Sequence, residues 1–231
     1  MAKIVVLCPS YRGISDAEVL ERASAKDLEA AGHTVGCVVV RRVALLDSAR
    51  NELLKQGRLL RPDFIVWLDD DARVEARTIR DMLSLDLPVL AAPVQMRGGQ
   101  GMPNVKIIAP PVAHANGLQT VECAWLGLGC VLMRMDAVDR VWEHFSHMHY
   151  RSPADGKRSL HLFGSTLVPV KELDPDDTTD DNVLLGDDLI FSYRMRQAGL
   201  TLRALVQAVT QHADLPRYCL AEDERFFKRP A

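Results

Sequence analysis

Three consecutive carboxylates, Asp69, Asp70 and Asp71, directly follow the apolar run Phe64–Leu68. By its length and composition this run is typical of a buried strand. Like charges packed so closely repel one another, most strongly in a partly dry cleft, so the cluster needs a compensating cation. Carboxylate oxygens are preferred ligands of hard divalent ions such as Mg²⁺ or Mn²⁺. Because a single Asp would suffice to cap a following helix, the triplet favours a metal site over a cap.

Two further carboxylates, Asp187 and Asp188, follow Gly186 and open a predicted helix that extends to Ala198. A carboxylate at the rim of a pocket can act as a general base toward a hydroxyl group. Helix capping explains the same two residues equally well. His212 lies just after a short β-like run and becomes a candidate metal ligand only if other ligands lie beside it.

Other side chains at the ends of predicted elements can contact a ligand. The segment Pro9-Ser10-Tyr11-Arg12 places an aromatic ring and a guanidinium after the first strand, where the alternative is an ordinary turn. Arg50, on the helix before the acidic triplet, can pair with Asp69 or with a phosphate, or form a structural ion pair. The segment Trp125-Leu126-Gly127 combines an exposed-ring candidate with a glycine that permits close approach of the backbone to a ligand.

The remaining metal-like patterns are weak. His144, His147 and His149 form a short cluster, but no carboxylate or Cys completes it, so we do not expect a zinc site there. The five cysteines are odd in number and scattered, without a Cys-x-x-Cys pair. We therefore expect neither a disulfide framework nor a thiolate zinc site, and interpret the cysteines as small buried hydrophobic residues.

Strands and helices alternate along the first part of the chain, which predicts βαβ units and a mostly parallel sheet. In such a sheet ligands bind at the carboxyl ends of the strands, where the Asp triplet falls. A capping box at Ser15 and Glu18 and a stop at Gly32 predict one helix between the first two strands. The full expectation is strands at 3–8, 34–40, 64–68, 89–94, 105–109, 119–123, 130–133 and 201–206, and helices at 15–31, 44–56, 74–85, 136–145 and 187–198.

Two segments are predicted to be loops of functional interest. Arg97–Pro103 is glycine-rich and is interpreted as a mobile loop, and the polar stretch Ser146–Asp181 as a long excursion. We expect these two segments to form a lid and an acceptor surface, because mobile loops commonly close such sites and exclude water.

Composition excludes several classes of protein. The 231 residues, 48% hydrophobic and 26% charged, are typical of one globular domain and not of a disordered chain. No apolar run approaches the roughly 18 to 20 residues that span a bilayer, and the first residues do not form a signal peptide, so we expect no integral membrane segment and a cytoplasmic protein. The net charge is −3, yet Glu172–Asp188 carries eight carboxylates and no Lys or Arg, which leaves +5 for the rest.

Taken in order, these motifs resemble a GT-A glycosyltransferase and are most similar to the family 2 group. The resemblance covers about residues 3–213 and implies an α/β fold: a single GT-A (Rossmann-like) domain, with a mostly parallel central sheet flanked by helices and a small antiparallel portion. It implies a nucleotide-binding half at about 1–95, an acceptor-side half at about 96–215 and a short C-terminal tail within 1–231. The matching segments are Pro9-Ser10-Tyr11, Ala49-Arg50-Asn51, Leu68–Asp71 as the Asp-x-Asp motif, Gly127–Arg134, Gly186-Asp187-Asp188 with Arg194 and Gly199, and His212.

The resemblance also implies roles for these residues. Asp71 and His212, with Asp69, would hold Mn²⁺ or Mg²⁺, which acts as a Lewis acid at the diphosphate of a nucleotide-diphosphate sugar. The donor would contact Pro9, Tyr11, Arg12, Arg50, Asp69 and Asp70, and the acceptor would contact Trp125 and Gly127. Asp188 would be the base that deprotonates the acceptor hydroxyl, with inversion at the anomeric carbon. Since Asp187 replaces the usual Glu, the choice between Asp187 and Asp188 stays open. The acceptor would be a glycan, a lipid-linked glycan or a modified nucleic acid.

Two other functions fit the same residues. A metal-dependent nucleotidyltransferase also needs an α/β nucleotide fold and clustered carboxylates, but Pro9-Ser10-Tyr11-Arg12-Gly13 is a poor phosphate-binding loop. A catalytically inactive module that binds nucleotide sugars is the non-enzymatic alternative. The products separate the two enzymes, because glycosyl transfer releases a nucleoside diphosphate and nucleotidyl transfer releases pyrophosphate.

Overall fold

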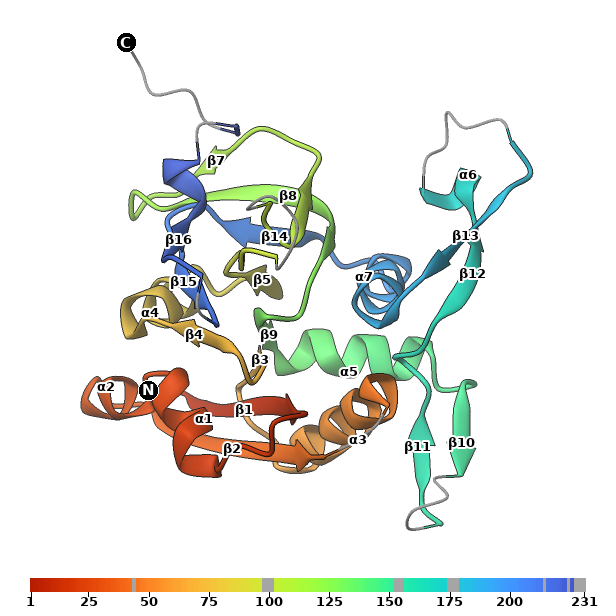
Figure 1. Ribbon diagram of the computed structural model, residues 1–231, viewed down its shortest axis with the longest axis horizontal. Coiled ribbons are helices and arrows are strands. Elements are labelled where there is room, and N and C mark those ends of the chain that lie inside the picture. Colours follow the sequence, from red (N-terminus) through yellow and green to blue (C-terminus); the bar gives the residue numbers. More distant parts are fainter. Residues whose placement is uncertain are drawn as a thin grey trace.

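A nine-stranded sheet forms the centre of the protein, as seen in the computed structural model (Figure 1). The structure describes residues 1–42, 45–96, 102–151, 156–173, 179–213, 215–223 and 225–226. Within them the strand order is β2-β1-β3-β9-β5-β14-β8-β6, and β7 pairs with β8. The strands are β1 (Lys3–Ser10), β2 (Thr34–Arg41), β3 (Phe64–Leu68), β5 (Val89–Ala91), β6 (Val105–Ile107), β7 (Val112–Ala113), β8 (Gln119–Leu126), β9 (Cys130–Arg134) and β14 (Leu202–Leu205).

Most strands of this sheet share one direction. β1 pairs in parallel with β2 and β3, and β5 pairs in parallel with β14. β9 runs antiparallel to β3 and β5, and β8 runs antiparallel to β14, β6 and β7. The predicted α/β class, with a mostly parallel sheet and an antiparallel portion, is confirmed.

Helices cover both faces of the sheet because its central strands are apolar on both sides. In β1, Val5 and Leu7 face one hydrophobic cluster, while Ile4 and Val6 face the other, as the two-residue repeat of a strand requires. Helices α3, α5 and α7 contribute to the first cluster, and α1, α2 and α4 to the second. The helices are α1 (Asp16–Arg22), α2 (Ala25–Ala30), α3 (Leu46–Leu59), α4 (Ala76–Leu85), α5 (Met135–His144) and α7 (Asp187–Gln197).

Two helix predictions need correction. The single helix expected from Ser15 to Gly32 is two helices, because the chain turns at Ser24, where φ is 52° and the hydroxyl donates to the carbonyl of Val74 (2.8 Å). The predicted capping box at Ser15 is present. The helix predicted at 44–56 is α3, which begins at Leu46 and continues through Gly57 to Leu59; Gly57 packs so closely on Leu7 that a Cβ would lie 2.8 Å from Leu7 Cδ2.

The stretch Ser146–Asp181 was expected to be a loop, but much of it is ordered structure. It contains the β10–β11 hairpin, strand β12 and helix α6, and β12 pairs with β13 to form a second extension, the β12–β13 arm. Both project from the same side of the molecule (Figure 1). Leu162 and Phe163, which connect them, are buried in the core and explain why the segment is ordered. The new elements are β10 (His149–Arg151), β11 (Arg158–Leu160), β12 (Thr166–Pro169), α6 (Val170–Leu173) and β13 (Asn182–Leu185).

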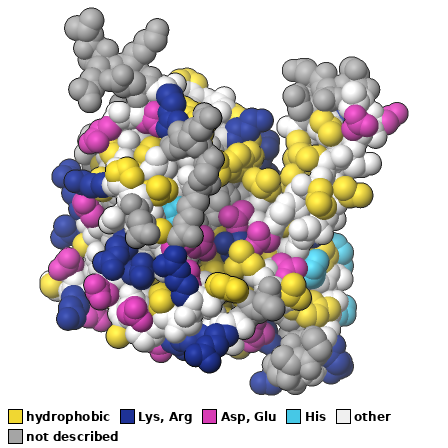
Figure 2. Space-filling model, in the orientation of Figure 1, with side chains coloured by type: hydrophobic (Ala, Val, Ile, Leu, Met, Phe, Trp, Pro, Cys, Tyr) yellow, Lys and Arg dark blue, Asp and Glu magenta, His cyan; other side chains and the backbone are white. Residues whose placement is uncertain are grey.

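The β12–β13 arm stands clear of the body and carries hydrophobic side chains (Figure 2). Leu167 and Leu184 lie directly opposite each other on it and are 65% and 64% exposed. The other predicted loop, Arg97–Pro103, falls outside the described residues except for Met102 and Pro103.

A small three-stranded sheet begins directly after the acidic triplet. It consists of β4 (Ala72–Val74), β15 (Val209–His212) and β16 (Tyr218–Cys219), and is followed by the short helix η1 (Leu220–Glu222). β15 is antiparallel to β4, so His212 pairs with Ala72 and lies beside Asp71. In the described part of the chain we find no helix with the length and apolar character needed to cross a bilayer.

Candidate active site

The carboxyl ends of β1 and β3, together with the start of α3, surround a pocket of about 310 Å³. The neighbouring parallel strands bring Ser10 and the Asp triplet to the same edge of the sheet, as the sequence predicts. Tyr11 is 84% exposed at the pocket wall, where its ring is free to contact a ligand. The pocket is lined by Pro9, Ser10, Tyr11, Val40, Leu46, Ala49, Asp69, Asp70 and Asp71.

Asp70 shapes this pocket by holding the turn after β1. Its carboxylate accepts hydrogen bonds from the Ser10 hydroxyl (3.0 Å) and from the Arg12 backbone N–H (2.9 Å), and it is buried. The Ser10 oxygen in turn accepts from the N–H of Ile14 (3.0 Å). Asp70 therefore fixes the segment that carries Tyr11 and Arg12, two residues predicted to bind the donor.

Arg50 gathers carboxylates from two parts of the chain. Its side chain is 2% exposed and donates to Asp69 (3.1 Å) and to both Asp187 and Asp188. Burial works against the charged guanidinium, but Asp188, Asp69 and Asp187 raise the pKa of Arg50 above its usual range. Arg50 thus stays charged and links the end of β3 to the first turn of α7.

The carboxyl of Asp188 has a pKa above its usual range. Burial raises the pKa of its carboxyl to about 6; Arg50 opposes this shift, whereas Asp69 and Asp187 add to it. Oδ2 also accepts from the backbone N–H of Leu128 (3.2 Å). Figure 2 shows acidic side chains gathered where the β12–β13 arm joins the body. A group that titrates near neutrality can both accept and release a proton there.

Asp71 and His212 present a ligand pair suited to a divalent cation. His212 Nδ1 lies 2.5 Å from the carbonyl oxygen of Gln95, which can only accept, so Nδ1 carries the proton. The other ring nitrogen, Nε2, lies 3.1 Å from Asp71 Oδ1. A ring nitrogen and a carboxylate oxygen this close are held by a proton between them or by a shared cation, and a hydrogen bond from Nδ1 to a carbonyl is typical of metal-bound imidazole. The donor set therefore fits Mn²⁺ or Mg²⁺, with phosphate and water completing the shell.

Asp69, which the resemblance adds to the same metal, pairs with Arg50. Among the residues that the structure describes, no group of three or more His, Cys, Asp and Glu side chains is arranged to hold a metal ion. A cation at this place would accordingly take two ligands from the chain and the others from substrate and solvent.

Trp125 and Gly127 lie at the end of β8. The Trp125 ring is half-buried opposite Lys106 of β6. Gly127 is explained by packing, since a Cβ would lie 2.6 Å from Asn104 Nδ2, and its N–H donates to the Asn104 carbonyl (2.7 Å). The adjacent Leu128 holds Asp188, so this turn positions the predicted base.

Sequence reasoning assigned no role to Ser192, which joins α7 to β8. Its hydroxyl accepts from the N–H of Leu126 (3.0 Å) and donates to the Leu126 carbonyl (2.9 Å). The signal was a serine directly after the apolar residues Leu189, Ile190 and Phe191, where a buried hydroxyl must find partners. Asn51, which the motif Ala49-Arg50-Asn51 contained without a role, is the second such residue and is treated below.

The cysteines were predicted to be buried; Cys8, Cys123 and Cys130 are, whereas Cys37 and Cys219 are half-buried. The five cysteines are free, and burial raises the pKa of the Cys123 and Cys130 thiols to about 12. His144 and His147 are exposed at the end of α5, while His149 lies on β10 with Nδ1 2.9 Å from Arg158 Nη2.

Comparison with known proteins identifies a shared fold. No family model matches the sequence, and no curated protein matches it significantly. The solved structure titled A197 from STIV is similar over 96% of this chain and 92% of its own, with a TM-score of 0.54 and 12% identity. This likeness shows that the two chains share an α/β fold.

More distant likenesses have titles that name ligands and activities of those proteins. They include GalNAc-T7 with UDP, GalNAc and Mn²⁺ (TM-score 0.48, 13% identity, 95% of this chain and 44% of that one). Another is S. aureus TarS (TM-score 0.43, 12% identity, 94% and 36%). The chain spans less than half of either protein, and at such TM-scores these likenesses carry no argument about its activity.

Proposed function

We propose that the protein is a metal-dependent glycosyltransferase that moves a sugar from a nucleotide-diphosphate sugar to an acceptor hydroxyl with inversion. The observation that carries the proposal is the buried Arg50, which joins Asp69 beside the nucleotide-sized pocket to Asp187 and Asp188 on α7. A donor pocket and a carboxylate suited to proton transfer thereby share one edge of the sheet. Residues of about 1–95 would serve the donor and those of about 96–215 the acceptor.

In this proposal the nucleotide lies in the pocket beside Pro9 and Tyr11, and the turn that Asp70 holds brings Arg12 toward the diphosphate. Asp71 and His212 would hold Mn²⁺ or Mg²⁺, which supplies a Lewis acid for the departing diphosphate. The acceptor lies on the side of Trp125 and Gly127, where Leu128 orients Asp188.

Asp188 is the proposed base, and Asp187 supports it. Both carboxylates pair with Arg50, but Asp188 also receives the N–H of Leu128 and has the raised pKa. Asp188 takes the proton of the acceptor hydroxyl as its oxygen attacks the anomeric carbon. The bond from that carbon to the diphosphate oxygen breaks, its electron pair leaves with the nucleoside diphosphate, and the configuration inverts.

The test is product analysis with a panel of nucleotide-diphosphate sugars and of nucleoside triphosphates, each with Mn²⁺, with Mg²⁺ and with chelator. We expect metal-dependent release of a nucleoside diphosphate from one class of donor, increased by a hydroxyl-bearing acceptor such as a glycan, a lipid-linked glycan or a modified nucleic acid. Release of pyrophosphate from a triphosphate would instead establish a nucleotidyltransferase. Binding without turnover under every condition would leave a nucleotide-sugar-binding module.

A further inference from the structure

Asn51 makes four hydrogen bonds from a side chain that is only 3% exposed. Its Oδ1 accepts the backbone N–H groups of Leu162 (2.7 Å) and Phe163 (3.0 Å). Its Nδ2 donates to the carbonyls of Phe163 (2.9 Å) and of Asp47, one turn earlier in α3 (2.9 Å). The side-chain amide thus makes all four hydrogen bonds of which it is capable, two as acceptor and two as donor. No other side chain of this size can make the same set.

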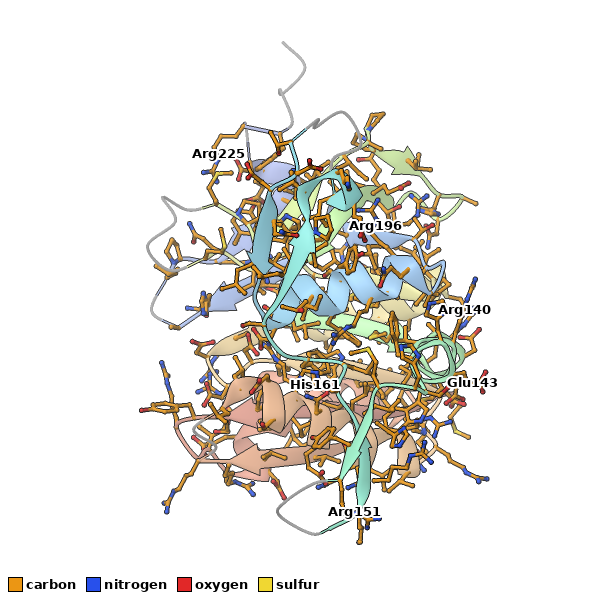
Figure 3. The ribbon with its side chains drawn as sticks, turned by 90° about the vertical axis from the view of Figure 1, so that its right-hand side faces the viewer. Arg140, Glu143, Arg151, His161, Arg196 and Arg225 are labelled. Carbon is orange, nitrogen blue, oxygen red and sulfur yellow. The ribbon has the colours of Figure 1, made fainter. Side chains whose placement is uncertain are left out.

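The segment that Asn51 holds, His161–Phe163, connects the β10–β11 hairpin to the β12–β13 arm; we call it the anchor segment. Figure 3 shows His161 between the hairpin, which carries Arg151 toward its tip, and helix α7. The anchor segment is held from α7 as well, because Arg194 donates to the His161 carbonyl (2.8 Å). Arg194 is buried, and its guanidinium lies 5.9 Å from the centre of the Phe145 ring.

Phe163 connects the anchor segment to the elements that carry the candidate catalytic groups. Its ring stacks on Phe191 at 4.3 Å between centroids and meets Trp67 edge-on at 5.4 Å. Trp67 precedes Asp69 by two residues on β3, and Phe191 follows Asp187 by one helical turn in α7. All three rings are buried, and such aromatic pairs favour fixed relative orientations.

Helix α3 therefore reaches the same site in two ways from adjacent residues. Arg50 pairs with Asp69, Asp187 and Asp188. Asn51 binds the backbone of Phe163, whose ring packs against Trp67 and Phe191. The first turns of α7 are held by these ion pairs, by the bond from Leu128 to Asp188 and by the bonds of Ser192 to Leu126. The contact of Phe191 with Phe163 adds a further restraint, which depends on Phe163 being fixed.

We propose that Asn51 is a positioning residue, which fixes the anchor segment and through it the distance and orientation of Asp187 and Asp188 relative to Arg50 and Asp69. The proposal rests on the proposed function for its catalytic readout, since it is Asp188 that must meet the acceptor hydroxyl. It assigns Asn51 no contact with donor, acceptor or metal.

The experiment compares Asn51→Ala and Asn51→Asp with Gln56→Ala. The Asp variant keeps an acceptor for Leu162 and Phe163 but loses both donations, and it sets a carboxylate oxygen against two carbonyls. Gln56 is the matched control, because it is an amide on the exposed face of the same helix and donates to the nearby Glu52 carboxylate (2.8 Å). We measure kcat and donor KM, nucleotide binding by thermal shift, and hydrogen exchange of the 186–192 backbone.

For both Asn51 variants we expect kcat to fall by about tenfold to a hundredfold, since misplacing a catalytic group by about 1 Å has effects of that size. Donor KM and nucleotide binding should change by less than about twofold, and exchange at 186–192 should rise. The control should match the parent protein in every measurement. Unchanged kcat per folded molecule, or an equal loss in donor binding, would overturn the proposal and leave Asn51 a residue of general stability.

Hydrogen exchange keeps this test separate from that of the proposed function. If the parent protein transfers no sugar, the proposed reaction fails, but faster exchange at 186–192 in the Asn51 variants alone still supports positioning. If the parent protein is active and exchange at 186–192 is the same in all variants, the positioning role is wrong and the proposed function is untouched. Should Asn51→Ala fail to fold, Asn51→Asp and an Arg194→Met variant, which releases the other end of the anchor segment, provide the same readouts.

Discussion

At the scale of single residues, Asp188 is the group on which the proposed chemistry depends. We expect Asp188→Asn to lower kcat by about a hundredfold to ten-thousandfold, because a general base contributes on that order, while donor binding is retained. Asp187→Asn should reduce kcat less, since Asp187 lacks the bond to Leu128. Steady-state kinetics with matched thermal-shift binding measure both, and a larger loss for Asp187→Asn would reverse the two assignments.

The pH dependence follows from the same carboxyl. Burial holds the pKa of Asp188 at about 6, so the group is protonated below that pH and cannot accept the hydroxyl proton. We expect kcat/KM to rise as the pH increases through about 6 and to level off above it. The measurement is a rate profile from pH 5 to pH 8 in buffers of constant ionic strength. A flat profile across this range would contradict the assignment of Asp188 as the base.

His212 allows a test of the metal without a catalytic assay. We expect the shift in melting temperature caused by Mn²⁺ with a nucleoside diphosphate to disappear in His212→Ala. The neighbouring Gln211→Ala serves as control, because Gln211 is exposed on the same strand and donates to the Leu215 carbonyl (3.4 Å). If both variants keep the metal-dependent shift, His212 is not a ligand.

At the scale of elements, the turn between β8 and β9 depends on the absence of a side chain at Gly127. A Cβ there would lie 2.6 Å from Nδ2 and 2.9 Å from Cβ of Asn104, which is itself held by a bond from the Val94 N–H to Oδ1 (2.8 Å). We expect Gly127→Ala to destabilise the protein by about 1 to 3 kcal/mol, the usual cost of overpacking. Gly36→Ala in β2 meets no atom within 4 Å and is the control. Denaturant unfolding measures both, and equal stabilities would show that Asn104 moves aside freely.

Elements with strong local signals were predictable from the sequence, and those set by tertiary contacts were not. Apolar runs such as Ile4–Leu7 and Phe64–Leu68 predicted the central strands and showed that they alternate with helices. The break at Ser24 escaped prediction because its cause is a hydrogen bond to Val74, fifty residues away. The hairpin and the arm escaped prediction because a few scattered apolar residues, among them Leu160, Leu162 and Phe163, fix that polar stretch to the core.

The candidate site divides in the same way. The Asp triplet, Arg50 and the Asp187-Asp188 pair were visible as clustered charges, and the structure brings Arg50, Asp69, Asp187 and Asp188 together. The roles of Ser10, Leu128 and Asn51 were not visible, because backbone N–H groups and single amides acquire partners only after the chain folds. Asp70 binds the turn after β1, and this too could not be predicted, because its partner Ser10 lies sixty residues earlier in the chain.

At the scale of the whole molecule, a bound donor should stabilise the complete fold, because its pocket is built from β1, α3 and the end of β3. A ligand present at a hundred times its dissociation constant adds about 2.7 kcal/mol to the free energy of unfolding. We expect a matching rise in melting temperature with the right nucleotide sugar and metal, and its loss on adding chelator. No shift with any nucleoside diphosphate or nucleotide sugar would exclude the pocket as a donor site.

The anchor segment has a consequence for how chains of this fold can diverge. The hairpin ends at this segment and the arm begins after it, so the chain returns to the core between the two projections. The arm packs on the start of α7, where Val168 and Leu185 share a buried cluster with Ile190, so a change in the arm also reaches α7. We expect residues inserted between β10 and β11 to change the reach of the hairpin while the anchor segment keeps its bonds to Asn51.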